Sequence, residues 1–124
     1  MRALFSHILV AHTVRVAFAF LMVVHALIHL MGFAKAFGLA QIAQLKQPIS
    51  PPLGVLWLLA ALGFLAGAIL LFVEPRWWWA PAAAALVLSQ AVILTDWSEA
   101  RVGTVANLVV LVPVVVSLLR IARR

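Results

Sequence analysis

The chain contains no cysteine and no tyrosine, and only three of its 124 residues are acidic. Without cysteine, disulfides, thiolate metal sites and thiol catalysis are excluded. Charged residues make up 10% of the chain, whereas they form about a quarter of an ordinary soluble domain. A functional site must therefore be built from histidines, amides, hydroxyls and very few carboxylates.

Apolar residues, in contrast, are abundant. They account for 67% of the chain, and the mean hydropathy is +1.20. A chain of this length has room for four spans of about 20 residues with short connections, and for no separate soluble domain. We therefore expect an all-α integral membrane bundle of four transmembrane helices, with residues 1–124 forming a single domain.

Charged residues and turn residues divide the apolar sequence into four runs. Proline at the start of the second run suits a first helical turn, and Pro113 within the fourth run predicts a kink. Residues 1–13 are also apolar, and they fit either an interfacial helix or an extension of the first span. The predicted spans cover residues 14–34, 51–73, 77–95 and 103–121.

The connections between these runs carry their own signals. Glutamines alternate with aliphatic residues between Lys35 and Pro52, which predicts a short helix in the membrane interface. The tryptophans at 77–79 are expected to anchor the chain at the headgroup level. The D-x-x-E pattern from Asp96 to Glu99 predicts a capping box, with Arg101 close enough to pair with either acid.

Gly63 and Gly67 form a G-x-x-x-G pattern in the second run. This pattern leaves one helix face without bulky side chains, so another backbone can approach closely. A neighbouring helix of the same chain is the favoured partner, because a compact bundle needs such contacts internally. A homodimer interface is the alternative.

The net charge of +6 does not predict nucleic-acid binding, because the basic residues lie at the edges of the apolar runs. With four spans, both termini share one side of the membrane with the turn near Arg76. Three basic residues lie on the other side: Lys35, Lys46 and Arg101. The terminal side carries six: Arg2, Arg15, Arg76, Arg120, Arg123 and Arg124. The positive-inside rule therefore predicts cytoplasmic termini.

His25 and His29 are the clearest functional signal, because ionisable side chains within a membrane span are costly and tend to mark a polar cavity or relay. Counting 1.5 Å per helical residue places His29, Gln90 and Asn107 at similar depth below the outer boundary. One interpretation is that these groups satisfy one another as interhelical hydrogen bonds. The other is an outward-opening ligand pocket with His29 and Asp96 at its mouth and His25 at its floor.

The histidine pair is compatible with two kinds of cofactor. Histidines at i and i+4 can ligate one metal ion, although a complete site needs further ligands from Asp96, Glu99 or a second chain. A quinone needs a hydrogen-bond donor, a lipid-accessible slot and aromatic walls. These could be supplied by His29, Gln90, Phe33 and Trp97. Haem held by two histidines of one chain is not expected, because the later spans contain no histidine.

The run from His25 to Gly38, with Gln47–Ser50, Ser89–Gln90 and Asp96–Ser98, resembles a group of small uncharacterised bacterial membrane proteins. The chain is also loosely similar to the DoxX-like four-helix superfamily. That resemblance implies a bacterial cytoplasmic membrane and a link to quinone-dependent redox complexes. It supplies no catalytic motif that these residues match.

Together, these patterns predict a non-enzymatic accessory or scaffold protein, in a membrane redox assembly or with another membrane partner. No nucleophile, phosphate loop or multi-histidine motif indicates an enzyme. The first alternative is binding of a small ligand, either quinone or a metal ion, at His25 and His29. The second is a permeation pathway for a small solute or protons, with His25 as relay.

Overall fold

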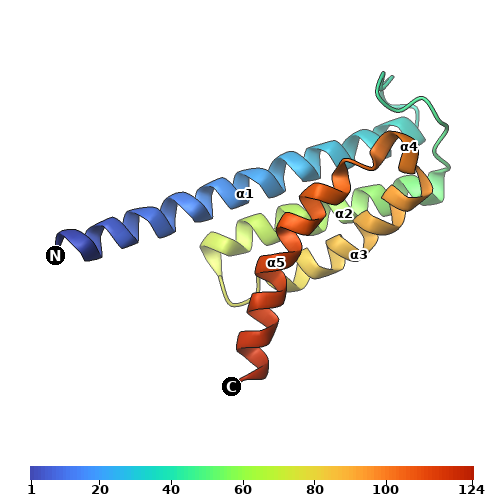
Figure 1. Ribbon diagram of the computed structural model, residues 1–124. Coiled ribbons are helices and arrows are strands. Elements are labelled where there is room, and N and C mark those ends of the chain that lie inside the picture. Colours follow the sequence, from blue (N-terminus) through green and yellow to red (C-terminus); the bar gives the residue numbers. More distant parts are fainter.

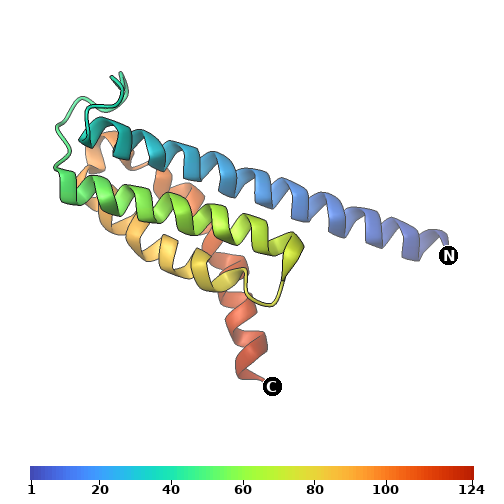
Figure 2. The same cartoon turned by 180° about the vertical axis from the view of Figure 1, so that it is seen from behind.

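The computed structural model describes residues 1–124, and its only regular secondary structure is helical (Figure 1). The helices are α1 (Arg2–Ala36), α2 (Pro51–Val73), α3 (Trp79–Thr95), α4 (Trp97–Ala100) and α5 (Gly103–Ala122). α1, α2 and α3 lie side by side with α2 in the middle, and α5 packs over one face of this layer, mainly on α3 (Figures 1 and 2). The prediction of an all-α protein is confirmed.

Three helices are long and apolar enough to cross a membrane, namely α1, α2 and α5. The fourth apolar helix, α3, has 17 residues and begins at Trp79, two residues after the predicted start. Large apolar side chains are exposed along all four of these helices. This outward-facing apolar surface is typical of a membrane protein, whose helices face lipid rather than water.

α1 is one continuous helix of 35 residues, about 52 Å long at 1.5 Å per residue. Residues 2–13 thus extend the first predicted span and do not form a separate element. Their end of α1 projects well beyond α2 (Figures 1 and 2). Leu4, Phe5, Ile8 and Leu9 on this projecting segment are exposed.

The predicted interfacial helix between Lys35 and Pro52 is absent, and this prediction was wrong. α1 continues to Ala36, with Phe37 as the C-cap residue, and Gly38 then adopts a left-handed φ of 67°. The amide of Gly38 donates to the carbonyl of Lys35, as expected for a glycine that closes a helix C-terminus. The following residues are too few to offset the cost of nucleating another helix unless they pack well.

The core lies between α1, α2 and α3 and is made of small and aromatic residues. A Cβ added at Gly63 would lie 2.8 Å from the Cβ of Ala85 and 2.9 Å from the carbonyl oxygen of Pro81, and one at Gly67 would crowd Met22. The face with Gly63 and Gly67 therefore packs against α3 and α1 of the same chain.

The tryptophans at 77–79 do not act as one anchor. Trp77 is exposed, whereas Trp78 is buried in the core and meets Phe18 edge-to-face at 5.4 Å between ring centroids. Trp79 donates from its indole nitrogen to the carbonyl of Arg76 at 3.0 Å and so fixes the turn between α2 and α3.

The predicted capping box at Asp96 is also wrong. Asp96 precedes the short helix α4, but its side chain makes no capping hydrogen bond. Glu99 turns away to bind the backbone of the 37–50 loop, and Arg101 forms no ion pair. The only salt bridge joins Arg76 and Glu74, two residues apart.

Pro113 lies within α5 without ending it, because the helix continues to Ala122. The ribbon of α5 changes direction along its length, so that its C-terminal half diverges from α1 (Figure 1). Both termini lie at the end of the molecule opposite the 37–50 loop and α4 (Figures 1 and 2).

Candidate functional site

A network of hydrogen bonds joins α1, α3 and α5 inside the bundle. The Oδ1 atom of Asn107 lies 2.8 Å from Nε2 of His25 and accepts from the hydroxyl of Ser89 at 3.0 Å. The Asn107 amide donates to Gln90 at 3.0 Å, and Gln90 donates to the Thr104 hydroxyl at 3.1 Å. Asn107 therefore connects every other member of the network directly or through Gln90.

This network assigns the proton of His25. Because Asn107 uses its Oδ1 atom toward the histidine, and an amide oxygen only accepts, His25 must donate from Nε2. The residue is 2% exposed, and its ring packs against Phe64 at 4.8 Å between centroids. His25 is thus held in place by a polar partner on one side and an aromatic ring on the other.

His29 has the opposite tautomer. Its Nδ1 atom lies 2.9 Å from the backbone carbonyl oxygen of His25, which only accepts, so Nδ1 carries the proton. In a neutral ring, Nε2 then presents a lone pair. This atom has no hydrogen-bond partner in the protein. It is also shielded from solvent, because the residue is only 1% exposed.

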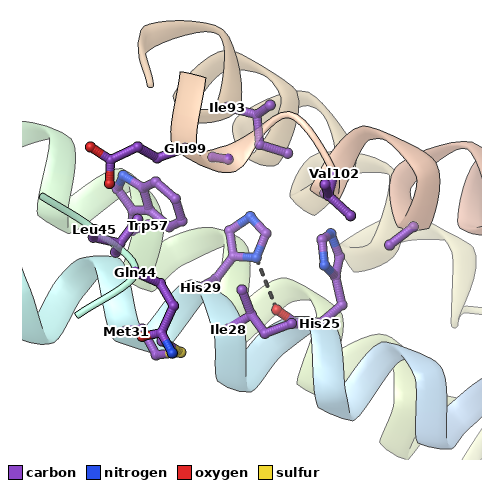
Figure 3. Close-up of a pocket in the computed structure, with 13 residues that line it drawn as sticks. His25, Ile28, His29, Met31, Gln44, Leu45, Trp57, Ile93, Glu99 and Val102 are labelled. Atoms are coloured by element: carbon purple, nitrogen blue, oxygen red, sulfur yellow. Dashed lines mark hydrogen bonds between the residues drawn. The ribbon is translucent and has the colours of Figure 1, made fainter. Parts of the chain in front are cut away.

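His29, which carries this unpartnered nitrogen, borders a cavity of about 350 Å³. Its walls come from α1, the 37–50 loop, α2 and the α3–α5 region (Figure 3). The lining is mostly apolar: His25, Ile28, His29, Met31, Gln44, Leu45, Trp57, Ile93, Glu99, Ala100, Val102, Gly103 and Ala106. A mostly apolar cavity with a small number of polar groups is characteristic of small-molecule sites.

Aromatic rings fix the histidines at the cavity wall. The His25 and His29 rings meet edge-to-face, with centroids 4.5 Å apart and planes at 83°. Trp57 lies 5.2 Å and Phe64 lies 5.7 Å from His29, measured between ring centroids. Gly32 makes room for Trp57, because a Cβ at this position would overlap the indole ring.

The 37–50 loop covers the cavity and is held from both sides. Glu99 accepts hydrogen bonds from the backbone amides of Lys46 and Gln47, the latter at 2.8 Å. The Lys35 ammonium donates to the carbonyl of Leu45, which is buried. These bonds place Leu45 and the neighbouring Gln44 against the cavity.

Asp96 does not line this cavity, in contrast to the predicted mouth of the pocket. It is 5% exposed, and neither of its carboxyl oxygens has a partner. Burial raises the pKa of this carboxyl above its ordinary value, and the charge of Glu99 acts in the same direction, while Lys35 opposes it. Glu99, rather than Asp96, is the acidic side chain at the cavity.

The structure contains no group of three or more His, Cys, Asp or Glu side chains placed to hold one metal ion. His25 already uses Nε2, and His29 already uses Nδ1. The pair thus offers one nitrogen each, fewer than the three or four protein ligands of a typical zinc site.

Four of the sequence-predicted site residues lie together. The structure brings His25, Gln90 and Asn107 into one hydrogen-bond network and places His29 beside it, in ring contact with His25. The fifth, Asp96, lies outside both the network and the cavity lining.

Several residues of the site were not predicted from the sequence, among them Ser89, Thr104 and Trp57. Thr104 ends the hydrogen-bond network by accepting from Gln90, and Trp57 forms a wall of the cavity. The sequence around Trp57 carries no signal for this role, because the space for its indole is provided by Gly32 on another helix.

Comparisons with family models, curated proteins and solved structures give no match to this chain. The resemblance to DoxX-like proteins therefore stays a prediction, and the site is interpreted from its own geometry.

Proposed function

We propose that this chain is a four-span membrane protein that binds a small, mainly apolar ligand in the cavity beside His29. The observation that carries this proposal is the buried Nε2 atom of His29, a residue that borders the cavity, because this atom has no partner. A buried polar atom without a partner costs free energy, and a bound ligand would relieve that cost. The cavity volume falls within the range of about 300–1,000 Å³ usual for ligand sites.

The tautomer of His29 indicates the chemical class of the ligand. A lone pair on Nε2 accepts a hydrogen bond and repels a carbonyl oxygen. The best-fitting ligand is therefore an apolar molecule with a hydroxyl or amine group, such as a phenol or a quinol. A quinone carbonyl would need a protonated Nε2, so the oxidised form fits less well than the reduced one.

The four-span topology is part of this proposal. α3 would span about 25 Å, at the short end of the range for transmembrane helices. The exposed Trp77 just before its start suits the headgroup level. The positive-inside rule then places both termini in the cytoplasm of a bacterial cell and the cavity in the outer half of the cytoplasmic membrane.

The permeation alternative has less support. On the side of His25 facing the termini, the core contains Met22, Phe64, Val110 and Val114, which are buried and apolar. A proton or polar solute moving through this layer would meet no hydrogen-bonding side chain among them. A site open from one side fits this arrangement better than a continuous pathway.

An accessory or scaffold role is the second candidate. The exposed apolar residues of the projecting end of α1, including Phe5 and Ile8, favour contact with a membrane-embedded partner. The DoxX-like resemblance points to a redox assembly for that partner. Ligand binding and this role are compatible, because the cavity and the projecting segment lie at opposite ends of α1 (Figure 1).

The proposal is tested with para-butylphenol and its methyl ether, which differ in the hydroxyl donor. Binding to the detergent-purified protein is measured by calorimetry. We expect the phenol to bind roughly tenfold more tightly, the usual value of one net hydrogen bond. The substitution His29→Leu should abolish this difference.

His12→Leu is the matched control, because His12 is an exposed histidine on the same helix, outside the cavity. This variant should keep the preference for the phenol. Equal binding of phenol and ether by the unmodified protein would contradict the hydrogen bond to His29. No binding of either compound would contradict the ligand site and leave the accessory role as the better explanation.

A further inference from the structure

A second cavity lies at the opposite end of the molecule from the histidines and has different chemistry. Its volume is about 360 Å³. It is lined by residues of α1, α2, the turn before α3, the start of α3 and α5: Arg15, Leu71, Pro75, Arg76, Trp78, Trp79, Ser117, Arg120, Ile121 and Arg124. Four arginines from three separate parts of the chain thus converge on one hollow.

The positive charge of this cavity is largely uncompensated. Glu74 pairs with Arg76 at 2.8 Å, and this is the only salt bridge in the structure. Arg15, Arg120 and Arg124 have no acidic partner. Since no acidic side chain lines the cavity, the three guanidinium groups repel one another unless an anion lies between them.

Two residues that line this cavity are held in place by packing and a hydrogen bond. Trp78 is buried against Phe18, and Trp79 donates to the carbonyl of Arg76, so these two lining residues are held in place. Ser117, which also lines the cavity, adds a neutral hydrogen-bonding group. Guanidinium groups bind phosphate oxygens in pairs, so this lining matches a phosphate group better than a small halide.

The position of the cavity points to a lipid as the source of the phosphate. The C-terminal half of α5 diverges from α1 at this end (Figure 1). Val14 and Leu119, which are the sequence neighbours of Arg15 and Arg120, are exposed. Apolar surface next to a basic hollow suits acyl chains below a headgroup. Basic pockets between membrane helices bind anionic lipid headgroups in this manner.

We propose that Arg15, Arg120 and Arg124 form a binding site for the phosphate of an anionic glycerophospholipid. A zwitterionic lipid fits less well, because its choline group would add a positive charge to the cluster. This site is independent of the His29 cavity, since no residue lines both.

The test counts lipids retained by the detergent-purified protein in native mass spectrometry. Dioleoylphosphatidylglycerol and dioleoylphosphatidylcholine are compared, because they share acyl chains and differ in net charge. We expect the anionic lipid to bind roughly tenfold more tightly or better. The double variant Arg15→Gln/Arg120→Gln should lose this preference.

The control is the double variant Arg2→Gln/Arg123→Gln, which has the same net charge as Arg15→Gln/Arg120→Gln. Both of its substitutions lie near the termini and outside the cavity. It should keep the preference, and both double variants should retain the helical content of the parent by circular dichroism. Equal losses in the two double variants would overturn the site in favour of general charge attraction. Equal binding of the two lipids would overturn it as well.

Glycerol phosphate, tested by calorimetry, separates the two sources of phosphate. We expect it to bind at least roughly tenfold more weakly than the lipid, because it lacks acyl chains. Binding as tight as that of the lipid would assign the arginines to a soluble phosphate compound and overturn the lipid proposal.

Discussion

At the scale of single residues, Asn107 and His29 have opposite relations to their surroundings. Asn107 uses both ends of its amide and connects α1, α3 and α5. His29 leaves one nitrogen unpaired beside a cavity. A buried polar group with all its bonds made specifies packing, whereas one with a missing bond is a candidate for binding.

Asn107→Leu should destabilise the bundle by about 1–3 kcal/mol, because it leaves His25, Ser89 and Gln90 without their shared partner. Thermal unfolding followed by circular dichroism in detergent measures this loss. Thr13→Val removes an exposed hydroxyl that bonds only to its own helix, so it should change stability far less. Similar effects of the two substitutions would argue against a network that holds the helices together.

Asp96 provides a pH-dependent prediction, since its folded-state pKa is raised above the ordinary value by burial and by Glu99. Between these two pKa values the folded state keeps a proton that the unfolded chain has lost, so stability falls as pH rises through this interval. Asp96→Asn should therefore raise the melting temperature at pH 7. The gain should shrink as pH falls toward about 4 and disappear below about pH 3, where the carboxyl is protonated in both states.

If Asp96→Asn raised the melting temperature by the same amount at every pH, the charge of the carboxyl would not be the cause. Glu99→Gln serves as the comparison, because Glu99 carries the same charge but uses both oxygens to hold the 37–50 loop. That variant should lower the melting temperature at pH 7.

At the scale of elements, local patterns predicted the helices well and the connections poorly. Apolar runs bounded by charges and by Pro51 gave the bounds of α2 and α5 within a residue or so. The 37–50 loop was misread because its shape depends on Glu99, about fifty residues away, and on Lys35. No local spacing of glutamines and leucines carries that information.

In the site, too, some features follow from local sequence and others depend on contacts between distant residues. Counting helical rise predicted that Gln90 and Asn107 share a layer with His29, because depth follows from sequence position alone. The structure instead bonds Asn107 to His25, one turn away on α1. The tautomers of His25 and His29 depend on which atoms face them, and this required the packed structure. The unpaired nitrogen could not be found from the i and i+4 spacing.

Close packing of α2 on α3 gives a prediction at this scale. Gly63→Leu should destabilise the protein by about 1–3 kcal/mol, because the added side chain meets Ala85 and the backbone of Pro81. Ala84→Leu adds a leucine at an exposed position of α3 and should have little effect. Denaturation in mixed detergent micelles compares the two, and equal stabilities would contradict the tight contact at Gly63.

At the scale of the whole molecule, the two cavities lie at opposite ends of the bundle, one apolar with histidines and one lined by arginines. The proposed topology places the first in the outer half of the membrane and the second at the cytoplasmic surface. An apolar core that includes Met22 and Phe64 separates them.

This topology is tested by single cysteines, which the natural chain lacks. The variant Gln41→Cys should react with a membrane-impermeant maleimide on intact bacterial cells that express the protein. The variant Arg123→Cys should react only after the membrane is permeabilised. The reverse pattern would place the histidine cavity on the cytoplasmic side, and labelling of both positions in intact cells would contradict an even number of spans with cytoplasmic termini.

The central claim is that His29 offers an unprotonated Nε2 atom to a ligand. Nitrogen NMR of isotope-labelled histidine in the detergent-solubilised protein tests it directly, with His29→Gln used to assign the signal. We expect Nδ1 protonated and Nε2 unprotonated in the free protein, and a change at Nε2 alone when para-butylphenol is added. A protonated Nε2 in the free protein, or a spectrum unchanged by the phenol, would contradict the account.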